Sequence, residues 1–211
     1  MLQLHYYPSN ASMAPHLLLE ELGAPFELKL VDRTRQAHKS AQYLKLNPNG
    51  LIPVLVDGDL VLYETAAICL HLVDTHAATG LAPALGTPER AHFYKWLVWL
   101  TNTLQATLII YFYPERWADT PEAAAQVRTH AEAKVGAMLD QLEAELAKGP
   151  WLLGKNFSAV DLYALMLCRW TRGFARPARS LPRLGEYLNR LTARPAVQRV
   201  FEREKLPPPS V

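Results

Sequence analysis

Two stretches in the first third of the chain carry groups that could bind a small zwitterion. In Asn47-Pro-Asn-Gly-Leu-Ile-Pro-Val-Leu55, the Ile52-Pro53 bond stands at the start of an apolar run. A cis bond costs little there and would turn the Ile52 N–H and C=O toward a peptide-like ligand. Glu64 and Thr65 begin a helical pattern, whose N-terminus favours a carboxylate while the Glu64 side chain can bind an ammonium group. Either motif alone is better explained by structure, Pro53 as an edge-strand proline and Thr65 as an N-cap; the two in order favour an amino-acid site.

Other reactive side chains in the sequence do not form sites. Cys69 and Cys168 belong to no CxxC motif or Cys/His cluster, so neither a metal site nor a dithiol redox centre is expected. The 22 basic and 20 acidic residues leave a formal net charge of +2, which excludes the strong basic field of a general nucleic-acid binder. The sequence has no apolar run of about eighteen residues and no signal-peptide pattern, so we expect no membrane association. We therefore expect a cytoplasmic protein with reduced thiols.

Short strands and helices must position these groups in the first eighty residues. Gly23 has the position of a helix stop, and Asp57-Gly58-Asp59 indicates a hairpin. The expected strands are residues 2–7, 26–31, 52–56 and 60–62, and the expected helices are residues 15–22, 41–46 and 65–76. This order, β-α-β-α-β-β-α, predicts a thioredoxin-like domain over residues 1–79.

The remainder of the 211-residue chain is expected to be helical. Strand patterns end before a linker rich in Pro and Gly, and apolar residues then recur at spacings of three and four. Thr120 is expected to cap one long helix and Gly149 to end it, while Ser158 and Asp161 form a capping box. The expected helices are residues 89–113, 121–148, 158 onward, 181–191 and 195–205, followed by a Pro-Pro-Pro tail. The fold class is therefore α+β, with an all-helical domain over residues 88–211.

In this order, the motifs resemble those of the glutathione S-transferase family. That family has a thioredoxin-like first domain with NPxGxIPxL followed by a Glu-Ser pair, and a helical second domain with the capping box. Thr65 replaces the usual Ser and keeps a hydroxyl. The resemblance covers nearly the whole chain and implies glutathione as co-substrate. It also implies the residues that bind it: His38, Lys39, Leu51, Ile52, Pro53, Glu64 and Thr65, with His38 and Lys39 at the glycine end.

Such chemistry needs a group that stabilises the glutathione thiolate, because the thiolate is the nucleophile. Lowering a thiol pKa from about 8.5 to about 6.5 requires roughly 2.7 kcal/mol, which one or two donors and a helix N-terminus can supply. Ser9-Asn10-Ala11-Ser12 lies at the turn after the first strand and resembles the S-x-x-S turn of the serine-type classes. Ser9 is the first candidate, with Asn10, Ser12 and a tyrosine, Tyr6 or Tyr7, as alternatives; Ser12 is as well explained as the N-cap of the first helix.

The sequence also departs from the bacterial beta class, which it resembles from Pro8 to His16. Ala11 stands where that class has its reactive cysteine, so a mixed-disulfide mechanism through that residue is excluded. Gln105 and Ala106 stand where it has a His-Lys pair. A glutaredoxin-like reductase is therefore the least favoured interpretation.

The resemblance implies a homodimeric detoxification transferase that joins glutathione to small hydrophobic electrophiles bound by the helical domain. Two alternatives stay open. One is a glutathione-binding protein without transferase turnover, because the reactive Cys and the His-Lys pair are missing. The other is a glutathione-dependent cis-trans isomerase, because the S-x-x-S turn is similar to that of zeta-type members.

Overall fold

The computed structural model describes residues 1–207; residues 208–211, which include the end of the expected Pro-Pro-Pro tail, lie outside the described residues. The chain divides into two compact units. One consists of Met1–Ala82 and the segment that begins at Thr192, and the other is Pro83–Leu191. The sequence-based division into residues 1–79 and 88–211 assigns the last helix to the helical domain, whereas its contacts place it in the first unit.

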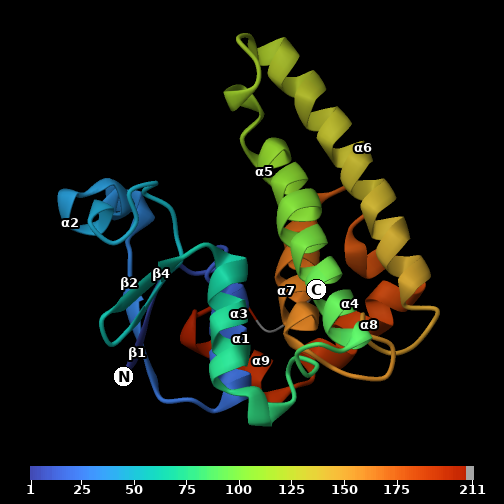
Figure 1. Cartoon of the computed structure of the whole chain (residues 1–211). Helices are drawn as coiled ribbons and strands as arrows, with labels where there is room; N and C mark the ends of the chain where they lie inside the picture. Colours follow the sequence, from blue (N-terminus) through green and yellow to red (C-terminus); the bar gives the residue numbers. More distant parts are fainter. Residues whose placement is uncertain (208–211) are drawn as a thin grey trace. The chain divides into compact units, whose positions relative to one another are not determined.

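The first unit is built on a four-stranded sheet with strand order β2-β1-β3-β4 (Figure 1). β1 pairs in parallel with β2 and antiparallel with β3, and β3 pairs antiparallel with β4. The strands are β1 (Leu2–Tyr6), β2 (Phe26–Leu30), β3 (Val54–Asp57) and β4 (Leu60–Tyr63). The helices of this unit are α1 (Met13–Leu22), α2 (Ala41–Leu44), α3 (Thr65–Thr75) and α9 (Pro195–Arg203). The predicted order β-α-β-α-β-β-α of a thioredoxin-like domain is confirmed.

Both faces of the sheet carry buried side chains, since successive residues of a strand point to opposite faces and Val54 and Leu55 of β3 are both fully buried. Leu4 and Leu55 are partners in the β1–β3 register, and both are fully buried. Helices α1 and α3 lie side by side in this unit (Figure 1). The preceding residue of β3, Val54, belongs to a smaller apolar cluster with Tyr43 of α2 and Ile52. The α2 segment and the loop before β3 are therefore fixed by one small core.

Ion pairs fasten α9 to the end of α1. The Glu20 carboxylate accepts hydrogen bonds from Arg199 Nε at 2.7 Å and from an Arg203 guanidinium N–H at 2.5 Å. Burial would raise the pKa of Glu20, but these two guanidinium groups together lower it below its usual value. Arg194 pairs with Glu21 in the same way. The last helix is thus held to α1 by ion pairs.

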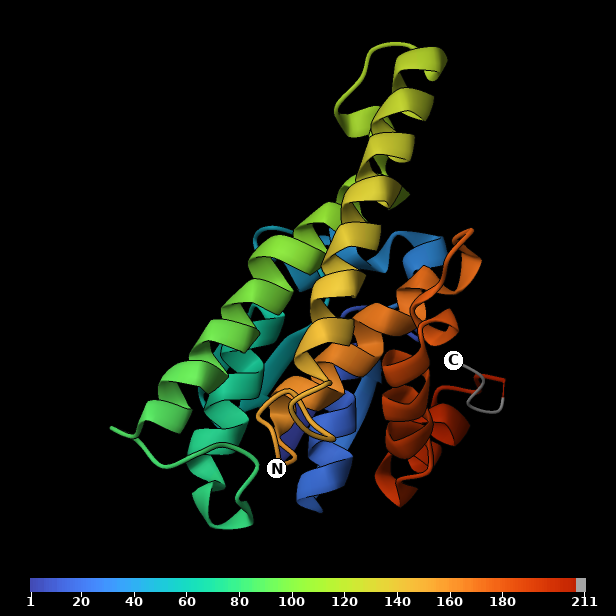
Figure 2. The ribbon, with the colours of Figure 1, turned by 90° about the vertical axis from the view of Figure 1, so that its right-hand side faces the viewer.

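The second unit consists of helices. Its first helical stretch contains a π-helical segment, Leu100–Gln105, that the sequence pattern does not predict. α5 and α6 lie side by side (Figure 2). The helices are α4 (Pro88–Trp99), α5 (Ala106–Phe112), α6 (Pro121–Glu145), α7 (Ala159–Trp170) and α8 (Pro182–Thr192), whose last residue falls in the first unit.

The end of α6 differs from the prediction. The helix stops at Glu145, although the sequence pattern continues to residue 148 and has Gly149 as the stop. Gly149 serves a different purpose, since a Cβ atom there would lie 2.5 Å from the carbonyl oxygen of Gly154. It allows two backbone segments to approach closely, and the expectation that it ends the helix is wrong.

The capping box at the start of α7 is confirmed. Ser158 and Asp161 are both buried, and every residue of α7 is buried as well. Among residues 1–207, no helix combines the length and apolar composition needed to cross a membrane. The same residues hold no group of three or more His, Cys, Asp or Glu side chains suited to a metal ion.

Candidate active site

The strand register brings three of the predicted motifs to one edge of the sheet. His5 pairs antiparallel with Val54, so the turn after β1 lies at the edge where β3 begins. Val54 also pairs with Tyr63, which places Pro53 and Glu64 next to each other at that edge. The Ser9 turn, the Ile52-Pro53 bond and the start of α3 therefore converge, although they are distant in the sequence.

The turn after β1 is closed by Ser12 and Asn10. The Ser12 hydroxyl donates to the Tyr7 carbonyl oxygen at 3.1 Å and accepts the Tyr7 N–H at 3.2 Å. The Asn10 N–H also donates to the Tyr7 carbonyl oxygen, at 3.2 Å. Ser12 is fully buried and holds the predicted N-cap position of α1, but its side chain makes no capping hydrogen bond to the helix. Its hydroxyl holds the turn together from inside.

Ser9 is half-buried and has a left-handed backbone, with φ of 59°. Its N–H donates to Oε2 of Glu204 at 2.7 Å. A serine in this conformation is strained, and such residues cluster at active sites. The alternative donor Tyr6 keeps its proton at neutral pH, because burial, followed by the charge of Glu204, raises its pKa, and it stays an alternative. The strained backbone at the turn makes Ser9 the first candidate for the thiolate donor.

The two cysteines are far from reactive. Cys69 on α3 and Cys168 on α7 are both free and buried. Burial raises the pKa of each thiol to about 12, so both are protonated at neutral pH. A nucleophilic thiolate at this site must come from a bound thiol.

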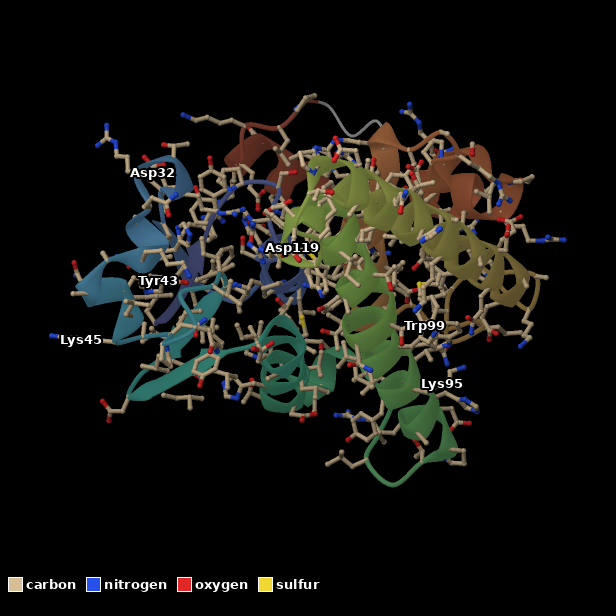
Figure 3. The ribbon with its side chains drawn as sticks, turned by 90° about the horizontal axis from the view of Figure 1, so that it is seen from above. Asp32, Tyr43, Lys45, Lys95, Trp99 and Asp119 are labelled. Atoms are coloured by element: carbon tan, nitrogen blue, oxygen red, sulfur yellow. The ribbon has the colours of Figure 1, made fainter. Side chains whose placement is uncertain are left out.

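The loop before β3 is shaped by a cis Ile52-Pro53 bond, as the sequence predicts. The Leu51 carbonyl oxygen accepts the Tyr43 hydroxyl at 2.8 Å and the Asn47 side-chain amide at 2.9 Å. Tyr43 is labelled in Figure 3, at the α2 segment. The side chain of Leu51 itself is exposed. Because β3 begins at Val54, Ile52 lies outside both ladders of that strand. The loop can therefore present the Ile52 backbone to a ligand.

The segment with His38 and Lys39 lies against the same loop. Lys39 Nζ donates to the Asn49 carbonyl oxygen at 3.3 Å. Gly50 has φ of 58°, and a Cβ atom there would lie 2.7 Å from Lys39 Nζ, so glycine permits this approach. Nδ1 of His38 is buried without a hydrogen-bond partner among the described residues. Burial lowers the pKa of His38, and the charges of Arg33 and Lys39 lower it further, which leaves a neutral ring.

Glu64 holds the N-cap position of α3 with φ of 75°. Its side chain is exposed and makes no hydrogen bond to its own helix. Thr65 is the first helical residue and is buried, so the interpretation of Thr65 as the N-cap is wrong. Glu64 thus combines a strained backbone with an exposed carboxylate, next to the first N–H groups of α3, which have no partner within the helix.

Three residues that shape this edge have no role assigned to them from the sequence: Tyr43, Asn47, which begins the predicted motif, and Glu204. The spacing Asn47-x-Asn49 could have indicated a side-chain turn, because the Asn49 N–H donates to the Asn47 side-chain oxygen at 3.0 Å. Tyr43 and Glu204 give no local signal, since each acts through a bond to a residue in a different segment, Leu51 and Ser9 respectively.

In the second unit, Gln105 occupies the last position of the π-helical segment. Its side-chain oxygen accepts the Tyr163 hydroxyl at 2.5 Å, and Ala106 next to it is exposed. Segments of π-helix are frequent at functional sites. This pair replaces the His-Lys pair of the beta class with a neutral amide and a methyl group.

Comparison with known proteins identifies the family. Residues 2–74 match the family "Glutathione S-transferase, N-terminal domain", and residues 125–203 match "Glutathione S-transferase, C-terminal domain". Glutathione S-transferase 3 of Zea mays is 34% identical over 200 residues, which span 91% of this chain and 89% of that protein. The chain belongs to the glutathione S-transferase family.

Two further relatives match this transferase over nearly its full length. Glutathione S-transferase GST-4.5 of Xanthomonas campestris is 28% identical over 97% of this chain and 100% of its own. A glutathione transferase homolog from Sulfitobacter, solved with bound glutathione, has a TM-score of 0.89 and 26% identity, covering 98% of this chain and 99% of that one. The predicted architecture of this transferase, a thioredoxin-like domain and a helical domain, is confirmed.

Proposed function

We propose that this transferase uses glutathione as co-substrate and joins its sulfur to a small hydrophobic electrophile. The observation that carries the proposal is the convergence of the Ser9 turn, the cis Ile52-Pro53 bond and Glu64 at one sheet edge. Relatives named glutathione S-transferases and a homolog with bound glutathione support the activity.

Each part of glutathione finds a complementary group along this edge. The ammonium group pairs with the exposed carboxylate of Glu64, and the adjacent carboxylate accepts N–H groups at the start of α3, where Thr65 adds a hydroxyl. The cysteinyl backbone pairs with the Ile52 N–H and C=O. The glycine carboxylate lies near His38 and Lys39, where the buried Nδ1 of His38 has no partner among the described residues.

In this arrangement, the glutathione sulfur lies at the Ser9 turn. The Ser9 hydroxyl donates to the sulfur and stabilises the thiolate over the thiol. The thiolate attacks the electrophilic carbon, a new C–S bond forms, and the leaving group departs with the bonding electron pair or, in an addition, a proton is taken up. The buried cysteines take no part, because both thiols stay protonated.

Replacing Ser9 with alanine should raise the pKa of the bound thiol by one unit or more. A lost hydrogen bond to a charged group is worth at least about 1.4 kcal/mol, and each pKa unit equals about 1.36 kcal/mol. The rate of conjugation at pH 6.5 should fall about tenfold or more, with little change in glutathione affinity. Ultraviolet titration of the bound thiolate measures the pKa.

Ser12→Ala is the comparison variant. Its hydroxyl binds the Tyr7 backbone, so we expect it to lose about 1–3 kcal/mol of stability and to keep the thiol pKa. Equal thiol pKa values in wild type and Ser9→Ala would remove Ser9 from the mechanism. A shift confined to Ser12→Ala would assign the role to Ser12 instead.

We further propose that the transferase is a cytoplasmic homodimer that acts in detoxification. Exposed apolar side chains support self-association: Tyr94 and Val98 lie one turn apart on α4, and Leu60 and Val61 lie on β4. The chain has a mass of 23.7 kDa, and sedimentation equilibrium should give twice this value. Val98→Asp should reduce the fraction of dimer. A monomeric wild type at micromolar concentration would contradict this assembly.

A further inference from the structure

The segment that follows α9 reaches the turn that carries Ser9. Glu204 follows the last residue of this helix, and its side chain is fully buried. Oε2 accepts the Ser9 N–H at 2.7 Å, and Oε1 lies 2.8 Å from Nδ1 of His16. A residue 195 positions away in the sequence therefore holds the backbone of the candidate thiolate donor.

The carboxylate of Glu204 is itself fixed in place. His16 is fully buried, with ring contacts to Tyr6 at 6.1 Å and Phe26 at 5.7 Å between centroids. Nε2 of His16 is buried and has no hydrogen-bond partner among residues 1–207, so the ring's hydrogen bond in this region is the one to Glu204. The Glu20 ion pairs hold α9, and with it the chain that leads to Glu204.

Ser9 needs such an anchor because its backbone is strained. A left-handed conformation in a residue other than glycine persists only where the surroundings fix it. The bonds that Ser12 and Asn10 make in the turn end on Tyr7, whereas the bond from the Ser9 N–H runs to Glu204. Hydrogen bonds from a backbone N–H to a carboxylate are short and strong, which suits the observed 2.7 Å.

We propose that Glu204 is a positioning residue for the transferase reaction. By accepting the Ser9 N–H, it keeps Ser9 in the conformation from which the hydroxyl donates to the glutathione sulfur. This inference rests on the proposed role of Ser9. Glu204 touches no reacting atom, and its effect on the thiolate passes through the Ser9 backbone.

Three substitutions of Glu204 distinguish the effect of its side-chain length from the effect of its negative charge. Glu204→Gln keeps an oxygen for the Ser9 N–H and an amide N–H for His16, so the thiol pKa should stay near that of wild type. Glu204→Asp keeps the charge but is one methylene shorter and cannot reach both partners. Glu204→Asp and Glu204→Ala should each raise the pKa of bound glutathione by about one unit and lower the rate at pH 6.5 about tenfold.

A double-mutant cycle identifies the route of the effect. If Glu204 acts through Ser9, then adding Glu204→Ala to Ser9→Ala should cause no further rise in the thiol pKa. Glu202→Ala is the matched control, because Glu202 lies on α9 and is exposed. It should leave the pKa, kcat and KM for glutathione unchanged. Ultraviolet titration and steady-state rates are measured at a temperature where each variant is folded by circular dichroism.

A wild-type thiol pKa in both Glu204→Ala and Glu204→Asp, together with a raised pKa in Ser9→Ala, would overturn the inference and leave the proposed role of Ser9 intact. Additive shifts in the double variant would also overturn it, since Glu204 would then act by another route. An unchanged pKa in Ser9→Ala would refute the role of Ser9 and this inference with it. If Glu204→Ala does not fold, the contrast between Glu204→Asp and Glu204→Gln decides by the same criterion.

Discussion

Replacing Asp161 with alanine should lower the free energy of unfolding by about 3 kcal/mol or more. The Asp161 carboxylate is fully buried and accepts the N–H groups of Leu152 at 2.9 Å and Ser158 at 2.8 Å, and the hydroxyl of Tyr187 at 2.9 Å. Each buried donor left without an acceptor costs about 1–3 kcal/mol. Guanidinium unfolding followed by circular dichroism at pH 7 measures the loss.

The cost of burying a charge offsets part of the stability that the Asp161 hydrogen bonds provide. Burial raises the pKa of Asp161 to about 6, although the backbone N–H groups of Leu152 and Ser158 and the hydroxyl of Tyr187 lower it. A folded-state pKa above the ordinary 3.8 means that protonation of Asp161 adds stability, and this pH-dependent part is fully present below pH 3.8. It is lost as the pH rises through about 6, while the hydrogen bonds that the carboxylate accepts remain at pH 7.

The pH dependence provides a second measurement. Wild type should lose stability relative to Asp161→Asn as the pH rises from 5 to 7, because the buried aspartate ionises in this range and the asparagine does not titrate. Asp140→Ala is the control for the alanine variant, since Asp140 forms an exposed ion pair with Arg176 and its removal should change the stability little. Equal stabilities of Asp161→Ala and Asp140→Ala would contradict the assigned role of the capping box.

The order of the elements could be predicted because its signals are local. Alternation in the strands, apolar spacing in the helices and punctuation by Gly and Pro all act within a few residues. The π-helical segment Leu100–Gln105 gives no such signal, and the Gln105 side chain in it bonds to Tyr163, which is 58 residues away in the sequence. The membership of α9 in the first unit is equally nonlocal, because it depends on the pairing of Glu20 with Arg199 and Arg203.

The candidate site shows the same division between local and nonlocal causes. The cis bond before Pro53 and the position of Glu64 follow from short motifs with fixed spacing. Ser12 holds the N-cap position, yet its hydroxyl bonds to the Tyr7 backbone in the turn before α1 and not to a helix N–H group. Glu204 lies in no motif, and only the folded chain shows that it meets Ser9.

Substitution of Glu64, the strained residue at the start of α3, tests whether its carboxylate binds glutathione. Replacing Glu64 with alanine should weaken glutathione binding by roughly 1.5–3 kcal/mol, the worth of a hydrogen bond to a charged group. The ligand ammonium group then loses its carboxylate partner. Isothermal titration calorimetry measures the affinity, and Glu27→Ala, which removes an exposed carboxylate on β2, should leave it unchanged.

Glycine at the same position separates binding from backbone strain. Alanine keeps a Cβ atom at φ of 75°, whereas glycine adopts this conformation without a steric penalty. Glu64→Gly should therefore lose as much glutathione affinity as Glu64→Ala while being more stable than it by about 1 kcal/mol. Wild-type affinity in both variants would remove Glu64 from the ammonium site. Loss of affinity in alanine alone would show that the conformation of the loop, and not the carboxylate, is what the ligand requires.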